Sequence, residues 1–292
     1  MRAWLAAALV VLGGAAPALH AAIEATDDSG RRIVLAQPAQ RIVALAPHLV
    51  EQLFAIGAGD RIVAASDYAD WPPAAQQIPR VARAHSVDLE RVAAARPDLI
   101  VVWGSGYPPA IIESLQRLQV PVLVDEPGSL DSVAASLERL GRLTGSSSAP
   151  AVAAQYRQQI AALRAQYAGR APVSVFYQIW AQPLMTLSGR HVVGEAIRLC
   201  GGRNVFEDLA PLAPQVSAEA VIAADPQVIV TAEPGAQPSA ALDAWRRHPT
   251  LRAVQAGRLV TLDADRINRH GLRRAGEIAL LCEHLDRART AN

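Results

Sequence analysis

The segment VDLERVAAARPDLIV at residues 87–101 returns as VSAEAVIAADPQVIV at residues 216–230. The glutamates of the two copies, Glu90 and Glu219, and their prolines, Pro97 and Pro226, are 129 positions apart (219 − 90 and 226 − 97). In each copy a helical pattern is closed by the proline and is followed by an apolar strand. Two copies of so long a pattern predict two similarly built lobes. A crevice between lobes is a common place for a small ligand to bind.

Short apolar strands alternate with helical patterns on both sides of the middle of the chain. In the first half we expect strands at 41–45, 61–65, 99–103 and 120–124, and helices at 48–56, 89–96 and 108–118. In the second half we expect strands at 173–179, 227–231 and 258–262, and helices at 191–199, 217–224, 240–247 and 270–288. This alternation predicts an α/β fold with mainly parallel sheets flanked by helices.

The most helical segment, residues 129–168, lies between the two halves. Apolar residues at 152, 156, 160, 163 and 167 recur on one face of a long helix. We therefore assign an N-terminal lobe to 22–145, a connecting helix to 146–169 and a C-terminal lobe to 170–292. Because a helix between lobes is stiffer than a glycine hinge, we expect only a small closure on ligand binding.

Residues 1–21 have the pattern of a signal peptide. Arg2 precedes an apolar stretch, Trp4 to Ala16, that is too short to span a bilayer, and we place the cleavage after Ala21. A membrane anchor is the alternative. We therefore expect an exported, periplasmic protein. The formal net charge of +1 argues against nucleic acid or a membrane surface as a partner.

Cys200 and Cys282 are the only cysteines. In an exported chain they predict one disulfide, with two buried free thiols as the alternative. The sequence lacks a Gly-x-Ser-x-Gly elbow, a phosphate-binding glycine loop and a His-Glu-x-x-His motif, and its histidines are scattered. We therefore expect no catalytic residues and no metal site, and we expect His48 and His191 to have structural roles. An exported hydrolase or a metal chaperone is the alternative from another functional class.

Four predicted loops follow the carboxyl ends of strands, where ligand contacts arise in parallel sheets. Aromatic residues are 4% of the chain, yet five of them fall in these loops: Tyr68, Trp71, Trp103, Tyr107 and Trp180. Aromatic faces beside a few polar groups suit a large, flat, mostly apolar ligand. The structural alternatives are packing for Trp71 and a core contact for Trp103.

Asp265 and Arg269 lie four positions apart in the last of these loops. They could fix amide or carboxylate groups of a ligand, or they could form an ordinary surface ion pair. Glu90 and Glu219 lie just inside two helix starts, where a carboxylate complements the helix dipole. Their matched positions suggest a second role, as two negative points that set the register of a pseudo-symmetric partner.

From about Arg41 onward, the chain resembles periplasmic binding proteins of the helical-backbone class (class III), which serve ABC importers of cobalamin, haem and ferric siderophores. The resemblance lies in RIVALAP at 41–47, SDY at 66–68 with WPP at 71–73, LE at 89–90 with RPDLI at 96–100, and CGGRNVF at 200–206. It implies two lobes with mainly parallel sheets, joined by one long rigid helix. It also implies that Glu90 and Glu219 dock on arginines of a membrane permease.

Within that class, the chain most resembles the cobalamin receptors. The resemblance implies ligand contacts at Tyr68, Trp103, Asp265 and Arg269, to which we add Trp180, and a disulfide between Cys200 and Cys282. Those receptors often have tryptophans at the positions of Ala84 and Ala213, so this pocket is less aromatic. We therefore expect a monomeric protein that captures cobalamin or a related corrinoid between its lobes and delivers it to the permease. Haem, with Tyr68 as its axial ligand, and a ferric siderophore are the alternatives.

Overall fold

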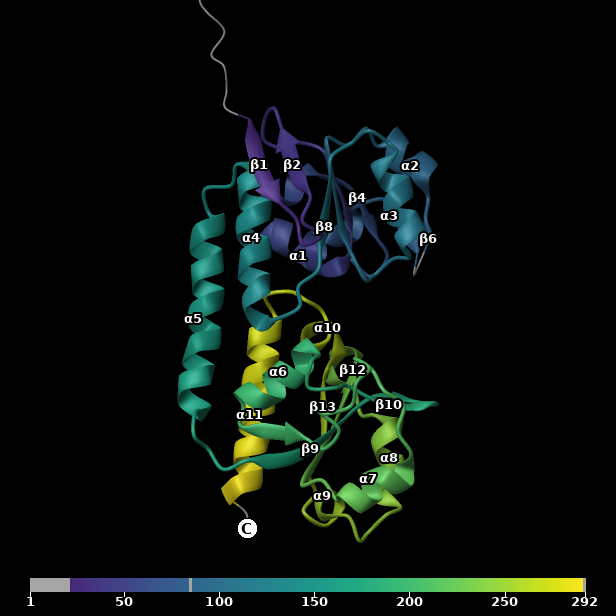
Figure 1. Cartoon of the computed structure of the whole chain (residues 1–292), viewed down its shortest axis with the longest axis vertical. Helices are drawn as coiled ribbons and strands as arrows, with labels where there is room; N and C mark the ends of the chain where they lie inside the picture. Colours follow the sequence, from purple (N-terminus) through teal and green to yellow (C-terminus); the bar gives the residue numbers. More distant parts are fainter. Residues whose placement is uncertain (1–21, 84–85, 291–292) are drawn as a thin grey trace, which may run out of the picture.

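The computed structural model describes residues 22–83 and 86–290, so the predicted signal peptide and Ala84 lie outside the described residues. The chain forms two lobes, and helix α5 (Ala149–Tyr167) runs along one side of both (Figure 1). The predicted α/β fold with parallel-rich sheets flanked by helices is confirmed. The predicted lobe boundaries stay predictions.

The N-terminal lobe contains a six-stranded sheet in the order β6-β5-β4-β3-β7-β8, parallel except for the β5–β6 pair. Its strands are β3 (Ile42–Leu45), β4 (Ile62–Ser66), β5 (Arg80–Arg83), β6 (Ser86–Val87), β7 (Leu99–Trp103) and β8 (Val122–Asp125). Its helices are α1 (Pro47–Ala55), α2 (Leu89–Ala94), α3 (Pro109–Gln116) and α4 (Leu130–Thr144).

The central strand β3 is buried along its whole length because helices cover both faces of the sheet. Successive side chains of a strand point to opposite faces. Val43 and Leu45 therefore pack in the apolar cluster that contains Val92 of α2. Ile42 and Ala44 pack on the other face, in the cluster that includes α1 and α4 residues.

The C-terminal lobe has a second sheet in the order β10-β9-β12-β13, with β11 also pairing β9. Only the β9–β10 pair is antiparallel. The strands are β9 (Val173–Ala181), β10 (Leu184–Thr186), β11 (Gly202–Asn204), β12 (Val228–Glu233) and β13 (Leu259–Asp263). The helices are α6 (Val192–Leu199), α7 (Ala218–Ala224), α8 (Ala240–Arg246), α9 (Arg252–Gln255), α10 (Ala264–Ile267) and α11 (Arg274–Thr290).

Helix α5 lies alongside α4 in the N-terminal lobe and alongside α11 in the C-terminal lobe, on the same side of both lobes (Figure 1). Helix α4 begins at a capping box made by Ser129 and Ser132, and it ends at Gly145, whose φ of 66° closes the helix in the left-handed region. One apolar cluster runs from α1 and α4 through α5 to α11. The two lobes therefore share a continuous core along this side. A disulfide joins Cys200, after α6, to Cys282 of α11.

The structure contains several short elements that were not predicted, and some boundaries differ. A two-stranded hairpin of β1 (Ile23–Thr26) and β2 (Arg32–Leu35) precedes the first sheet. Strand β9 continues through Trp180, which we had placed in a loop, because β10 turns back and pairs Met185 with it. The loop predicted after β13 contains the short helix α10, and the last helix begins at Arg274 and not at residue 270.

Candidate functional site

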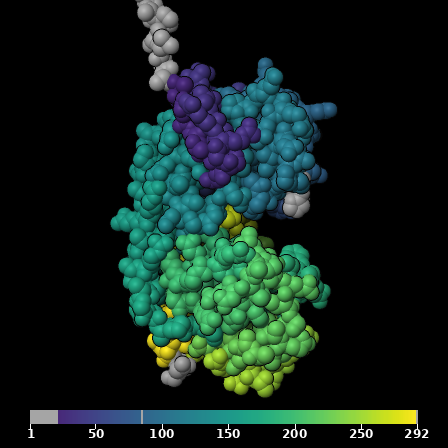
Figure 2. Space-filling model, in the orientation of Figure 1, coloured from purple at the N-terminus to yellow at the C-terminus, as the bar shows by residue number. Residues whose placement is uncertain are grey.

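The carboxyl ends of the two sheets face each other. Strand β8 leads into Leu130, whose backbone N–H donates to Glu195 of the C-terminal lobe at 2.8 Å. Strand β13 leads towards Arg269, which contacts Asp70 of the N-terminal lobe. The space-filling view shows a hollow between the lobes on the side away from α5 (Figure 2). The loops that follow these parallel strands therefore meet at one cleft.

A pocket of about 160 Å³ lies at the carboxyl ends of β3, β4 and β7. Its walls come from three loops and comprise Leu45, Ala46, Pro47, Ser66, Asp67, Tyr68, Trp103, Gly106 and Tyr107. The structure thus brings two of the predicted ligand contacts, Tyr68 and Trp103, together in one pocket. Both were selected because they follow a strand, and the parallel sheet places such positions at one edge.

Tyr68 is the most exposed aromatic residue of the described chain, with 73% of its surface accessible. Its φ of 61° lies in the left-handed region, which a bulky side chain rarely adopts and which costs about 1–3 kcal/mol. The backbone N–H of Asp67, just before it, donates to Ala82 O at 2.9 Å and fixes the start of this turn. The strained backbone therefore holds the phenol ring out towards solvent instead of against the core.

Trp103 lies at the end of β7 and is half-buried. Its ring centroid lies 5.7 Å from that of His48 and 5.4 Å from that of His270, so residues of both lobes surround it. Tyr107 is buried, and burial raises the pKa of its phenol to about 12 although the nearby Ser66 hydroxyl acts in the opposite direction. Tyr107 is therefore a neutral wall residue, whereas Trp103 can offer part of its ring to a ligand.

Trp180 reaches solvent near the end of β9, with 62% of its surface exposed. Its indole N–H donates to the Gln182 carbonyl at 2.9 Å, within the β9–β10 hairpin. The Trp180 ring is thus held by its own hairpin. The loop placement was wrong, and its role as a ligand contact stays a prediction.

Asp265 of α10 and Arg269 form an ion pair at 2.6 Å. The Arg269 guanidinium also contacts Asp70 of the other lobe at 2.8 Å and approaches Glu51 of α1 at 3.7 Å. Burial opposes the charge on Asp70, but the hydrogen bond and the charge of Arg269 outweigh it, and the pKa of Asp70 lies below its ordinary value. The pair is therefore part of a contact between lobes rather than an isolated surface ion pair.

Arg273 makes a second contact between the lobes. It donates to Glu51 at 2.6 and 3.2 Å, and its guanidinium lies 4.9 Å from the centre of the Trp71 ring. Burial opposes the charge on Arg273, but Glu51 raises its pKa above the ordinary value. Sequence reasoning missed Glu51, Asp70 and Arg273. The available signals were Asp70 lying two positions after Tyr68 and a glutamate on the apolar face of α1.

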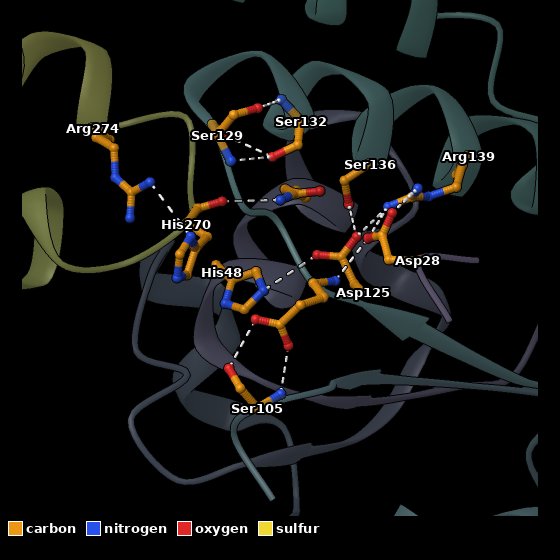
Figure 3. Close-up of polar contacts among 12 residues, drawn as sticks. Asp28, His48, Ser105, Asp125, Ser129, Ser132, Ser136, Arg139, His270 and Arg274 are labelled. Carbon is orange, nitrogen blue, oxygen red and sulfur yellow. Dashed lines mark hydrogen bonds and ion pairs between the residues drawn. The ribbon is translucent and has the colours of Figure 1, made fainter. Parts of the chain in front are cut away.

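A buried polar cluster lies behind the cleft, around Asp125 at the end of β8. Figure 3 shows this carboxylate between His48 and Arg139. Asp125 accepts from Ser136 at 2.5 Å and from Arg139 at 2.9 Å, and it lies 3.5 Å from His48 Nε2. Burial alone would raise the pKa of Asp125, but His48, Ser136 and Arg139 hold it below its ordinary value. Asp125 is therefore a buried carboxylate that keeps its charge.

Histidines and Arg274 line the junction of the lobes next to this cluster. The rings of His48 and His270 lie 5.5 Å apart, and the His270 carbonyl accepts from Gln52 at 3.1 Å. Burial and the charge of Arg274 lower the pKa of His270 to about 2. Within the described chain, no group of three His, Cys, Asp or Glu side chains is placed to hold a metal ion.

Glu90 and Glu219 are exposed in the first turns of α2 and α7. The preceding caps are alike, since Asp88 accepts from Arg91 N and Ser217 accepts from Ala220 N. Helices α2 and α7 both lie away from α5, one in each lobe (Figure 1). Both carboxylates are thus free to meet a partner, and their role in docking stays a prediction.

Comparisons with known proteins agree with this architecture. The family described as periplasmic binding protein matches residues 42–266. The vitamin B12-binding protein of Vibrio cholerae is 36% identical over 249 residues, which are 85% of this chain and 90% of that relative. The vitamin B12-binding protein of Yersinia pestis is 38% identical over 196 residues, 67% of this chain and 70% of that relative.

Solved structures give the same result. The periplasmic vitamin B12 binding protein BtuF of Vibrio cholerae has a TM-score of 0.79 at 36% identity, with 86% of this chain and 98% of that chain covered. The periplasmic heme-binding protein BhuT in complex with two hemes has a TM-score of 0.76 at 25% identity, with 86% and 99% covered. With a family match over most of its length and both sheets in place, the chain belongs to the periplasmic binding protein family.

Proposed function

We propose that this protein is the periplasmic receptor of an ABC importer, and that it captures cobalamin or a related corrinoid between its lobes and delivers it to the membrane permease. The exposed Tyr68 ring, held by a strained backbone over the cleft pocket, is the observation that carries the proposal. The relatives named vitamin B12-binding protein support the choice of ligand.

A corrinoid suits this cleft because it is a large macrocycle with an amide rim. The faces of Tyr68 and Trp103 would cover the ring, and Trp180 would extend that apolar surface from the other lobe. Asp265 and Arg269 would exchange hydrogen bonds with rim amides. In this role the protein binds and releases its ligand without breaking a bond, so it is a carrier and not an enzyme.

Delivery requires a surface that the permease can recognise. We propose that Glu90 and Glu219 meet basic residues of the permease, one contact from each lobe. Their exposure and their matched positions in the first turns of α2 and α7 support this role. The protein would act as a monomer, since two lobes of one chain already supply a pseudo-symmetric docking face.

The test is calorimetric titration of the purified protein with cyanocobalamin. We expect binding of one ligand per chain, and we expect Tyr68→Ala to weaken it by at least about tenfold, as for a truncated aromatic anchor. Val34→Ala is the control, because Val34 is an exposed apolar residue on β2, outside the cleft pocket. No binding heat at micromolar protein would reject the corrinoid assignment.

Haem is the second candidate, since the exposed Tyr68 phenol could ligate ferric iron and the similar BhuT structure holds two hemes. Addition of hemin would then produce a Soret band that is lost in Tyr68→Phe. That variant keeps the ring and removes only the oxygen, so it separates iron ligation from ring stacking. A ferric siderophore is less favoured, because carboxylates already pair both Arg269 and Arg273.

A further inference from the structure

The ion-paired cluster of Arg269 and Arg273 at the contact between the lobes contains more carboxylates than guanidinium groups. Arg269 lies within 4 Å of three of them, at 2.6 Å from Asp265, 2.8 Å from Asp70 and 3.7 Å from Glu51. Arg273 pairs with Glu51 at 2.6 Å. Three carboxylates thus surround two guanidinium groups, and the cluster has a formal charge of −1. Asp67, which lines the adjacent pocket, adds a further carboxyl group at the same edge.

The exposed side of this cluster is its acidic side. Only 14% of the Arg269 side chain is accessible, whereas 50% of Asp70 and 36% of Asp265 are accessible. Asp70 also stands two positions after Tyr68, in the loop that carries the exposed ring. A ligand that reaches this cluster therefore meets carboxylate oxygens before it meets the Arg269 guanidinium.

Asp70 keeps its charge at neutral pH. Burial opposes that charge, but the hydrogen bond and the charge of Arg269 hold the pKa of Asp70 below its ordinary value. An ionised carboxylate only accepts hydrogen bonds, so it favours N–H donors on a ligand and repels a second carboxylate.

We propose that Asp70 is a specificity-determining residue, which neutralises Arg269 and so selects ligands with neutral amide rims over ligands that carry carboxylates. This inference rests on the proposed function, since it concerns the rim of a corrinoid in the same cleft. Asp70 acts through Arg269 and through its own exposed oxygens, and the selection comes from charge rather than from the shape of the pocket.

The experiment compares cyanocobalamin with its monocarboxylates, in which one propionamide has been hydrolysed and the macrocycle is unchanged. Calorimetry gives the ratio of the two dissociation constants for each isomer, and the isomer that the wild type binds least is the informative one. We expect Asp70→Asn to reduce that ratio by about tenfold, because it leaves Arg269 with one neutralising partner fewer. The isosteric amide preserves the size of the side chain.

Asp243→Asn is the matched control. It makes the same change in net charge on the exposed surface of α8, where Asp243 pairs with Arg246, and it should leave the ratio unchanged. Asp265→Asn removes the other close partner of Arg269 and should reduce the ratio in the same direction. It keeps the inference testable if Asp70→Asn does not fold.

The outcomes separate the two proposals. If the wild type does not bind cyanocobalamin, the proposed function fails. If it binds cyanocobalamin and both variants retain the wild-type ratio, the function stands and the inference about Asp70 is overturned. A ratio that changes equally in Asp243→Asn would also overturn it, because the effect would then be one of overall charge.

Discussion

The two lobes differ at the end of the strand that pairs with the repeated strand. In the N-terminal lobe the repeated strand β7 pairs with β8, and Trp103 lies opposite Asp125. In the C-terminal lobe the repeated strand β12 pairs with β13, and Glu233 lies opposite Asp263. Each neighbouring strand therefore ends in an aspartate. Asp125 is fully buried, whereas Asp263 is partly exposed and caps α10 by accepting from Asp265 N at 2.9 Å.

The covering elements explain this difference. Helix α4 lies over the end of β8 and supplies Ser136 and Arg139 to the Asp125 carboxylate. At the end of β13 the backbone N–H of Asp263 donates to Glu277 of α11 at 2.7 Å, and the Asp263 side chain caps a short helix that carries a predicted ligand contact. The C-terminal lobe is instead cross-linked by the Cys200–Cys282 disulfide. The β7–β8 pair of the N-terminal lobe is thus stabilised by a buried ionic cluster at its end. The C-terminal lobe has no such cluster at the end of β12–β13 among the described residues, and a disulfide joins the end of its helix α6 to α11.

Removal of the disulfide should have the largest effect. The cysteines are 82 positions apart, and closing a loop of that length stabilises a protein by about 4–5 kcal/mol in the chain-entropy model. We expect Cys200→Ala with Cys282→Ala to lower the free energy of unfolding by up to that amount, as measured by urea denaturation. Hydrogen exchange should show β9 and β12 losing protection before β3 and β7. Equal loss in both lobes would contradict an effect confined to the second lobe.

Asp125→Asn should have the next largest effect. The change removes the carboxylate next to the buried His48 and one of the two carboxylates that pair with the half-buried Arg139, which keeps Asp28. Loss of a charged partner inside a buried cluster should cost about 2–3 kcal/mol. Urea denaturation should show this loss, with β3 and β7 exchanging first.

Asp263→Asn and Asp263→Ala are the matched comparisons in the other lobe. Asparagine can still cap α10, so the first variant should stay close to the wild type, and alanine should cost about 1 kcal/mol through loss of the cap. If Asp125→Asn were no more harmful than Asp263→Ala, the buried charge would not be what stabilises the first lobe.

The dependence of stability on pH should also come from the junction of the lobes. Burial and Arg274 lower the pKa of His191 to about 4 and that of His270 to about 2, whereas an unfolded histidine titrates near about 6.5. Between pH 6.5 and 4 the unfolded chain therefore binds protons that the folded chain does not. The free energy of unfolding therefore has its full value above that pH range. It decreases as the pH falls through the range, by up to about 1.4 kcal/mol per pH unit for each histidine.

His270→Asn removes one of these protons and should make the decrease shallower by about 1.4 kcal/mol per pH unit between pH 6 and 4.5. Urea denaturation at a series of pH values measures this slope. Asp125 contributes in the same direction but only at lower pH, below the ordinary range of a carboxyl pKa, because its depressed pKa means that the unfolded chain takes up this proton before the folded chain does. An unchanged slope in His270→Asn would show that His270 takes up its proton in the folded state as well.

The smallest effects on stability should come from Glu90→Gln and Glu219→Gln. Both side chains are exposed, so the midpoint of unfolding should stay near that of the wild type. If the docking proposal holds, binding to the permease in detergent should weaken several-fold in each variant and further in the double variant. Glu113→Gln, an exposed glutamate on α3, is the control. A loss confined to one lobe's glutamate would mean that docking is not symmetric.

Most of the sheet and helix pattern could be predicted because it depends on local periodicity. The apolar runs at β3, β7 and β12 are buried on both faces, and the helices between them carry apolar residues at helical spacing. Short elements were missed. Strands such as β10 and β11 have three residues each, too few to show a period, and the β1–β2 hairpin has only two short strands.

The candidate site was predictable only in part. Tyr68 and Trp103 could be found because the carboxyl ends of parallel strands meet at one edge. The contacts of Arg269 with Asp70 and of Arg273 with Glu51 could not, since the partners are 199 and 222 positions apart. No local pattern encodes which acidic residue will face a given arginine across the junction of two lobes.

The sequence by itself determined the repeated helix–strand unit, the two α/β lobes and the aromatic loops, because side-chain periodicity and the proline stops act over a few residues. Only the tertiary structure decided that Asp125 is a buried charge while Asp263 is a helix cap, and that both cleft arginines are already neutralised. These outcomes depend on which elements cover each strand end and on how the lobes are packed. Burial and the proximity of opposite charges are properties of the folded chain, and they set both the pKa values and the selectivity that we propose for the cleft.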